Sequence, residues 1–243
     1  MLNSVEGLKK LILCIYILIA LALCFLMGQM LVKADMPINE VLIKGEYRHI
    51  DGDQINLIAN EYLVGNFFTI NLKNTQKAFK KLPWVRDISV RRKWPDKLII
   101  NIEEHKVLGR WRNLGLVNNH GEIFNAAFQE DLPIFYGKEA LVKEITNKYY
   151  EINEILGKEL MQIGTITLSN RLSWEITTNN GLKIILGRDK IIVKLESFIN
   201  QYQEMLYKMK NRIEYVDLRY KDGFSVRVVD ESRTNPNKEK TIL

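Results

Sequence analysis

The sequence contains very little cysteine, and this limits how the protein can be stabilised. Among 243 residues there are two cysteines, Cys14 and Cys24, and both lie near the N-terminus. The rest of the chain can therefore form no disulfide, hold no thiol nucleophile and build no cysteine-based metal site. It must be stabilised by core packing alone. A segment of about 200 residues can bury enough surface for that, as two domains.

Motifs of catalysis and metal binding are absent as well. The sequence has no GxSxG, P-loop or GxGxxG motif, and no histidine pair with HExxH spacing. The histidines are His49, His105 and His120. His49 with Asp51 and Asp53 could form a metal site, but a helix cap explains these aspartates and is favoured. Glu103 and Glu104 would point to opposite faces of a strand, which excludes an acid/base pair. We predict no enzyme activity, catalytic residue, metal, cofactor or small-molecule substrate.

One long apolar run is present. From Leu11 to Val32 there is no charged residue, and about 20 apolar residues suffice to span a bilayer as a helix. A cleaved signal peptide, with a site at Val32-Lys33-Ala34, is the alternative, but signal h-regions are shorter, at about 7–15 residues. Lys9 and Lys10 on the leading side predict a cytoplasmic N-terminus. We expect a cytoplasmic tail over 1–10, a transmembrane helix over 11–32 and a spacer over 33–37, in a single-pass protein with everything beyond the span exported.

Charge of one sign is not concentrated anywhere. The net charge of +6 arises from 35 basic and 29 acidic residues that are spread through the chain. Lysines facing an anionic membrane or cell-wall polymer would fit this composition, but a solvated surface is favoured. Nucleic acid is excluded as a partner, because most of the chain is expected outside the cytoplasm. Asp217 and Arg219 place opposite charges on one face, which predicts a surface ion pair of little energetic value.

Residues 38–106 show the pattern of a small β-α-α-β-β domain. Glu40–Lys44 is expected to be a strand. A helix through Tyr62 would be capped by Asp51 or Asp53, and a second helix over Leu72–Leu82 by Asn71. A hairpin over 83–104 completes the domain.

In this hairpin, apolar residues with largely period-two spacing occur on both sides of the turn Trp94-Pro95-Asp96. The expected buried residues are Val85, Ile88, Val90, Leu98, Ile100 and Ile102. The expected outer face consists of Arg86, Arg91, Arg92, Lys93, Lys97 and Glu103. Trp84 and Trp94 are expected to close the two ends of the buried face.

Residues 107–229 predict a second α+β domain, with an antiparallel sheet and two helices against one face. The expected strands are Leu114–Val117, Glu122–Phe124, Ile163–Leu168, Ser173–Thr178, Leu182–Leu186, Tyr215–Arg219 and Phe224–Val229. The expected helices are Glu139–Leu156, with Gly157 as its stop, and Asp189–Lys210. Residues 230–243 are polar and expected to be disordered.

Several motifs together resemble one family. The segment Pro-Trp-Val, Val-Arg-Arg-Lys-Trp-Pro-Asp-Lys-Leu and Ile-x-Ile-x-Glu is similar to the end of the POTRA domain in the FtsQ/DivIB family of bitopic cell-division proteins. Further matches follow in order: Gly109-Arg110-Trp111, Leu132-Pro133, Tyr136-Gly137, Leu186-Gly187-Arg188 and Tyr215–Tyr220. Each motif alone is weak, but their order and spacing over nearly the whole chain are specific.

The resemblance implies a function in the divisome. It implies an inner-membrane protein with its C-terminus in the periplasm, located at the septum, that binds FtsB and FtsL and helps to control septal peptidoglycan synthesis. The last strand of such proteins recruits FtsB, which coils with FtsL. By position, the FtsB-binding residues would be Tyr220, Asp222, Gly223, Phe224 and Val228, with Arg171 and Arg219 holding an acidic group. Phe224 and Val228 depart from the enteric form, which leaves partner selectivity in doubt.

Two alternatives to this reading are open, a membrane-anchored POTRA chaperone and an unrelated membrane-anchored enzyme. The enzyme would need a polar cluster that the sequence does not show. A POTRA domain also occurs in chaperones of outer-membrane or secreted proteins, but the many alternating strands of a barrel are missing here. For Phe224, Val226 and Val228, ordinary core packing is the simpler interpretation. In that case only the backbone of the last strand, as a free sheet edge, would pair with a partner.

Overall fold

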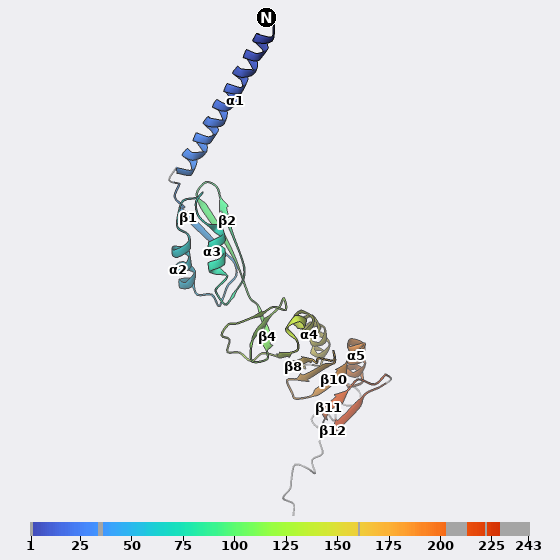
Figure 1. The fold of residues 1–243 in the computed structure, drawn as a ribbon. Helices are drawn as coiled ribbons and strands as arrows, with labels where there is room; N and C mark the ends of the chain where they lie inside the picture. The colour runs from blue at the N-terminus through green and yellow to red at the C-terminus, as the bar shows by residue number, and fades with distance from the viewer. Residues whose placement is uncertain (1, 34–35, 160, 203–212, 222, 229–243) are drawn as a thin grey trace, which may run out of the picture. The chain divides into compact units, whose positions relative to one another are not determined.

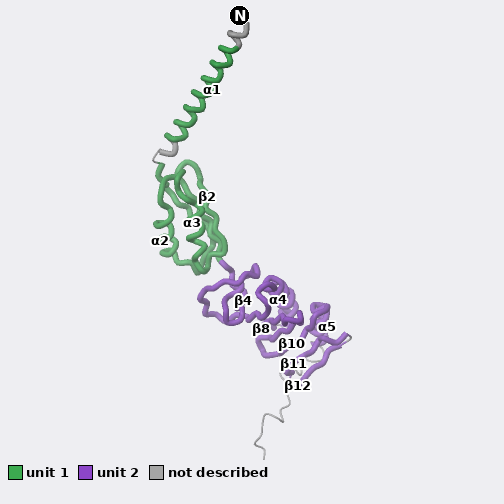
Figure 2. Tube along the Cα trace, in the orientation of Figure 1, with its two compact units in different colours: residues 1–104 green, residues 105–243 purple. Residues whose placement is uncertain are grey.

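The computed structural model describes residues 2–33, 36–159, 161–202, 213–221 and 223–228. The chain forms two compact units, Met1–Glu104 and His105–Leu243 (Figure 2). Several sequence-based predictions fall at least partly on residues outside the described ones. They are the spacer over 33–37, the last turns of the helix expected to reach Lys210, the site residue Asp222, the last residue of the strand expected to reach Val229 and the tail over 230–243.

The N-terminal apolar run forms one helix, α1 (Leu2–Lys33) (Figure 1). Its stretch Gly7–Met30 is long and apolar enough to cross a membrane, and within its most apolar window no part is buried by the protein. Exposed leucine and isoleucine side chains around the whole helix are stable in lipid and unfavourable in water. The predicted apolar N-terminal helix is therefore confirmed, while its orientation stays a prediction.

The first domain has the predicted β-α-α-β-β order. Its elements are β1 (Glu40–Lys44), α2 (Gly52–Tyr62), α3 (Leu72–Phe79), β2 (Val85–Lys93) and β3 (Lys97–Glu104). The sheet order is β1-β3-β2, with β1 parallel and β2 antiparallel to β3. Asp51 caps α2 by accepting from the Asp53 N–H, and Asn71 caps α3 by accepting from the Asn74 N–H. Helix α3 ends three residues earlier than predicted. Beyond it the chain continues in tighter turns, in which the Lys81 N–H donates to the Ala78 carbonyl and the Leu82 N–H to the Phe79 carbonyl.

The hairpin buries Val85, Ile88, Val90, Leu98, Ile100 and Ile102, as predicted. The prediction for Arg92 is wrong. Arg92 lies directly opposite Leu98 across the hairpin, and opposite residues of an antiparallel pair share a face. Its guanidinium donates to the carbonyls of Phe67, Phe68 and Ile70 at 2.5, 3.2 and 2.7 Å. The loop after α2 therefore covers this end of the inner face and satisfies Arg92 there.

The two tryptophans of the hairpin lie in opposite environments. Trp84 packs against the first-domain core and stacks on His49, with ring centroids 4.0 Å apart. Trp94 is 76% exposed, so the prediction that it closes the buried face is wrong. Strand β2 continues to Lys93, which pairs with Lys97, and Trp94 therefore lies in the turn beyond the last paired residues.

The second domain is built on a sheet whose described strands number nine, in the order β12-β11-β10-β9-β8-β7-β4-β5-β6. These are β4 (Val107–Trp111), β5 (Gly115–Asn118), β6 (Ile123–Phe124), β7 (Ile134–Tyr136), β8 (Ile163–Leu168), β9 (Trp174–Thr178), β10 (Lys183–Gly187), β11 (Ile213–Asp217) and β12 (Ser225–Val228). The α+β class is confirmed. The sheet is mixed, because β4–β7, β7–β8 and β10–β11 pair in parallel.

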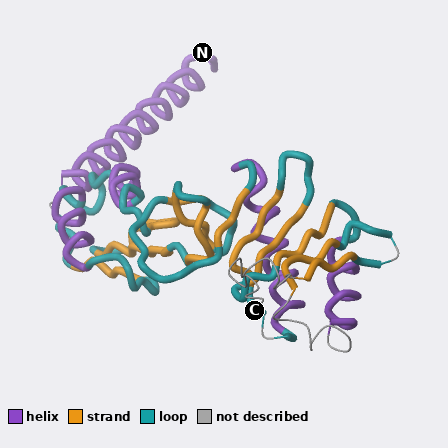
Figure 3. The backbone as a smooth tube through the Cα atoms, turned by 90° about the horizontal axis from the view of Figure 1, so that it is seen from below, coloured by secondary structure: helices purple, strands orange, loops and turns teal. Residues whose placement is uncertain are grey.

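Two helices cover one face of this sheet (Figure 3). A 3-10 turn, η1 (Glu139–Leu141), leads into α4 (Val142–Gly157), and α5 is Ile191–Gln201. Ile145, Ile152 and Leu156 of α4, with Leu195 and Phe198 of α5, are buried in the core against the strands. Parallel strands need a long crossover connection between them. Helix α4 provides it between β7 and β8, and α5 provides it between β10 and β11.

Candidate protein interface

Strand β12 is one edge of the second sheet. Among the described strands it pairs only with β11, in antiparallel register that sets Val226 opposite Val216 and Ser225 opposite Asp217. An edge strand presents a row of backbone N–H and C=O groups that can accept a further strand. The described part of the chain therefore has an open pairing edge at its end.

The side chains of β12 anchor it and leave its backbone edge accessible. Phe224 and Val226 pack against the second-domain core, and the Phe224 ring meets Phe198 edge-on at 5.3 Å. Ser225 is exposed, and the exposed Arg227 pairs with Glu214 at 3.3 Å. The side chains on one face of this segment are thus used in core packing, and the backbone edge that faces away from β11 has no described strand beside it.

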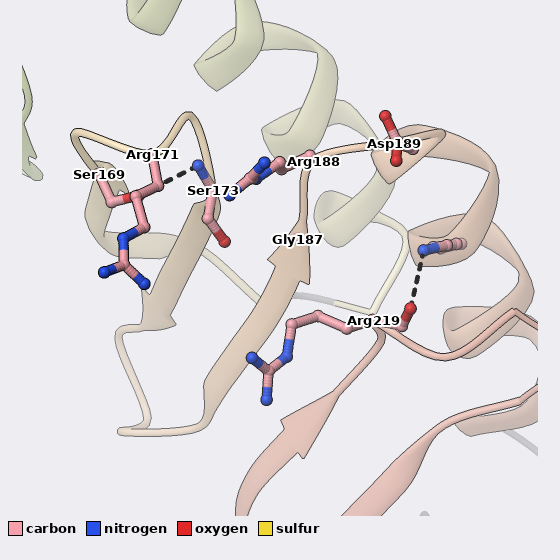
Figure 4. Close-up of a pocket in the computed structure, with 8 residues that line it drawn as sticks. Ser169, Arg171, Ser173, Gly187, Arg188, Asp189 and Arg219 are labelled. Carbon is pink, nitrogen blue, oxygen red and sulfur yellow. Dashed lines mark hydrogen bonds between the residues drawn. The ribbon is translucent and has the colours of Figure 1, made fainter.

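A hollow lined by basic residues lies beside the start of this edge (Figure 4). We call it the basic hollow; it has a volume of 470 Å³ and is lined by Ser169, Arg171, Ser173, Gly187, Arg188, Asp189, Lys194 and Arg219. Four cations and the carboxylate of Asp189 thus line it, and one of the cations, Arg219, is also paired with Asp217. Arg171 lies in the β8–β9 loop, Arg188 follows β10 and Arg219 follows β11, so the hollow is formed where strands end. Its charge suits a carboxylate from a partner.

Arg219 is held in place by Asp217. Its Nε donates to both carboxylate oxygens at 2.9 and 3.0 Å, and its Nη2 donates at 2.6 Å. The Asp217 side chain is 8% exposed and that of Arg219 is 62% exposed. The hydrogen bond from Arg219 is the main reason that the pKa of Asp217 lies below its usual value. The predicted pair is therefore present, but only Arg219 lies at the surface, because Asp217 is buried. The bidentate geometry of the pair is typical of the stronger carboxylate–arginine pairs.

Gly187 allows Arg219 to lie across the end of β10. This glycine has a φ of +82°, and a Cβ there would be 3.1 Å from Cγ of Arg219. Lys194 of α5 donates to the Arg219 carbonyl at 3.4 Å from the other side. A larger residue at 187 would strain the backbone and displace the guanidinium from the hollow.

The structure brings some predicted site residues together. Arg171 and Arg219 line the same hollow, and their guanidinium groups extend in the same direction (Figure 4). Val228 ends β12, Phe224 and Gly223 precede it, and Tyr220, in the connecting loop, is 58% exposed. The sequence reasoning missed Arg188 and Lys194. Arg188 stood in the Leu-Gly-Arg motif, and Lys194 lies on the helix that follows.

The residues first considered for metal binding have structural roles. Asp51 caps α2, and His49 stacks on Trp84 and lies 3.5 Å from the Glu104 carboxylate. Among the described residues no three histidine, cysteine or acidic side chains are grouped to hold a metal ion.

Fold and site together define a two-domain α+β protein: an apolar N-terminal helix, a small β-α-α-β-β domain and a second domain whose sheet, among the described strands, has an open edge at β12. Two family models match this chain. Residues 36–105 match the FtsQ-type POTRA domain, and residues 109–219 match the C-terminal domain of cell division protein FtsQ/DivIB.

Curated relatives agree with the family models. The chain is 35% identical to cell division protein FtsQ of Nitrosospira multiformis, over 88% of this chain and 93% of the relative. It is 34% identical to FtsQ of Neisseria gonorrhoeae, over 79% and 80% of the two chains. With FtsQ of Burkholderia pseudomallei it shares 33%, over 93% and 94%. The chain belongs to the FtsQ/DivIB family of cell-division proteins. It is a divisome component of a scaffold family, and its apolar helix is consistent with a single-pass membrane protein.

Proposed function

We propose that the edge of β12 binds FtsB by strand addition and that the basic hollow holds an acidic side chain of the same partner. One observation carries the proposal: Ser225, the first residue of β12, lies opposite Asp217, which holds Arg219 in the hollow. A strand added at this edge would therefore run beside the hollow. Backbone pairing would supply affinity, and the cations would select the partner.

The same proposal places the protein in the cell. The exported domains lie in the periplasm at the division septum, where FtsB coils with FtsL and the three chains together help to control septal peptidoglycan synthesis. The protein acts as a scaffold that links early and late division proteins, without a reaction of its own. The partner-contacting residues are Tyr220, Asp222, Gly223, Phe224 and Val228, with Arg171 and Arg219.

Proline substitutions test the edge. Adjacent residues of a strand direct their N–H groups to opposite neighbours, so of Ser225→Pro and Val226→Pro one removes an N–H that bonds β11 and the other removes an outward N–H. We expect one variant to keep native melting and lose FtsB binding in titrations of the full-length protein, and the other to melt at lower temperature.

Alanine variants are the matched controls for this experiment. Ser225→Ala and Val226→Ala shorten the same side chains and keep both N–H groups, so both should bind FtsB. Native melting together with full affinity in both proline variants would show that β12 is not the binding edge.

Charge reversal tests the hollow. Arg171→Glu should weaken FtsB binding by about tenfold or more at low salt and less at high salt, because an exposed ion pair is screened. Lys158→Glu, at the exposed end of α4 and outside the hollow, changes the net charge equally. Equal loss in both variants would mean that overall charge, and not the hollow, governs binding. Arg171 is preferred over Arg219 for this test, because Arg219 also neutralises the buried Asp217.

A further inference from the structure

The first domain exposes large apolar side chains at one end. Trp94 is 76% exposed, Val64 is 72% exposed and Phe68 is 41% exposed. A tryptophan is rarely so exposed in a soluble domain, because its ring buries a large apolar area when it can. The core of the domain does not need these side chains, since they lie outside the buried cluster.

These side chains lie where the chain enters the domain. The Asn39 N–H donates to the Asp96 carbonyl at 3.0 Å, and the Asn39 amide donates to the Asp96 carboxylate at 2.9 Å. Strand β1 runs parallel to β3 with Glu40 opposite Lys97, so the start of β1 lies beside the turn at 94–96. The Phe67 N–H donates to the Met36 carbonyl at 3.0 Å. The hydrogen bonds of Arg92 join the same loop to β2.

Chain length ties this end to the membrane. Helix α1 ends at Lys33, and Asn39 follows six residues later. Six residues span at most about 20 Å when fully extended. The headgroup regions add about 5–8 Å on each side of the hydrocarbon core. Asn39 is bonded to the turn that contains Trp94. The turn therefore stays near the lipid surface in every orientation of the domain, because the six connecting residues reach at most about 20 Å.

The charges beside Trp94 suit a bilayer surface. Arg91 and Lys93 are exposed, and Lys97 is already paired with Glu40. Tryptophan prefers the membrane–water interface because its ring is apolar and its indole N–H is a donor. Lysine and arginine beside it are attracted to anionic lipid headgroups.

We propose that this end of the first domain, formed by Trp94 with Phe68, Val64, Arg91 and Lys93, docks on the bilayer surface. Trp94 inserts among the headgroups, and the two cations contact lipid phosphates. The contact limits the tilt of the domain and so fixes the direction in which the exported part extends from the membrane. The proposal rests on α1 spanning the bilayer and is independent of β12 and FtsB.

Tryptophan fluorescence quenching tests the proposal. The four tryptophans are Trp84, Trp94, Trp111 and Trp174; α1 contains none, and Trp111 and Trp174 are buried. Full-length protein is reconstituted in vesicles of phosphatidylethanolamine and phosphatidylglycerol with brominated or plain acyl chains. Brominated chains should lower the emission of the wild type more than that of Trp94→Phe. The additional loss should be at most about one quarter of the total emission, because Trp94 is one of four tryptophans.

A displaced tryptophan is the matched control. Glu46 is exposed beyond the other end of β1, about 20 Å along the sheet from Asn39. Trp94→Phe with Glu46→Trp should be quenched no more than Trp94→Phe alone. Flotation with the vesicles shows separately that α1 is inserted in each variant, and unchanged melting shows that each variant is folded.

The charges are tested in the same vesicles. Arg91→Gln with Lys93→Gln, or replacement of phosphatidylglycerol by phosphatidylcholine, should reduce the quenching of the wild type toward that of Trp94→Phe. Equal quenching of the wild type and Trp94→Phe would overturn the proposal. Quenching of the variant with Trp94→Phe and Glu46→Trp as strong as that of the wild type would overturn it as well. Quenching that ignores both charge changes would overturn the part assigned to Arg91 and Lys93.

Discussion

Trp84 and Trp94 show that residue type does not determine environment even within one hairpin. Trp84 packs against the core, whereas Trp94 is 76% exposed. Trp84→Ala should lower the free energy of unfolding by about 2–3 kcal/mol, below the cost for a fully buried tryptophan because Trp84 is half-buried. Trp94→Ala should change it by less than about 0.5 kcal/mol. Denaturant unfolding of both full-length variants, followed by circular dichroism, measures the difference; equal losses would contradict it.

The buried Asp217 predicts a dependence of stability on pH. Its pKa in the folded protein is depressed below 3.8, first through the hydrogen bond from Arg219. Its contribution is therefore fully present above the unfolded-state pKa and is lost as the pH falls below 3.8 through the lower folded-state value. Asp217→Asn should lower melting at neutral pH and show a smaller further drop on acidification. If the melting temperatures of the variant and the wild type fall equally on acidification, the acid sensitivity lies at another group. Asp87 is one such group, because the hydrogen bond that it accepts from Lys80 is the main reason that its pKa is lowered.

Residues with local partners were predictable from sequence, and residues with distant partners were not. Asp51 and Asn71 cap helices within three residues of themselves, so a short pattern identifies them. Arg92 finds its acceptors 22 to 25 residues away, in a loop whose path the sequence does not show. For Asp217 the pattern gave the partner Arg219 correctly, but not the burial of the Asp217 side chain.

At the scale of elements, Gly45 ends β1 in a conformation that only glycine adopts readily. Its φ is +141°, and a Cβ there would lie 2.1 Å from the Ile102 carbonyl oxygen. Gly45→Ala should destabilise the first domain by about 2–3 kcal/mol. Gly52→Ala is the matched control, because nothing lies within 4 Å of its added Cβ at the first position of α2. That variant should stay within about 1 kcal/mol of wild type. Thermal melting of both variants distinguishes the effect of strain and steric clash at position 45 from the effect that any glycine-to-alanine change has on stability.

The positions of most elements followed from periodicity, but their neighbours in the sheet did not. Alternation of apolar residues shows which face of a strand is buried and says nothing about which strand lies beside it. Strand β10 pairs in parallel with β11 across the whole of α5, and β4 pairs with β7 across β5 and β6. A mixed sheet therefore appeared where an antiparallel one was predicted. The basic hollow could not be foreseen for the same reason, since it needs the ends of β10 and β11 side by side.

At the scale of the whole molecule, the two ends of the first domain lead to different parts of the chain. The start of β1 and the turn at 94–96 lie at the end where the chain arrives from α1, while β3 runs away from it to Glu104, where the second unit begins. The proposed membrane contact and the proposed FtsB edge therefore lie in different units. Variants at Trp94 and at β12 should be separable, with quenching lost in one and FtsB binding lost in the other.

The charge at the start of the apolar helix predicts the orientation of the protein in the membrane. Lys9 and Lys10 precede the span, and lysines next to a span are retained on the cytoplasmic side. A reporter that is active only after export, fused after Val228, should therefore be active, and the full-length protein should stay with the membrane after an alkaline wash. Lys9→Glu with Lys10→Glu removes the bias and should lower reporter activity, whereas Lys158→Glu with Lys183→Glu, distant from the span, should leave it unchanged. Release by the alkaline wash would mean that the apolar run is cleaved as a signal. An inactive reporter on a protein that stays in the membrane would mean that the two domains after the span lie in the cytoplasm.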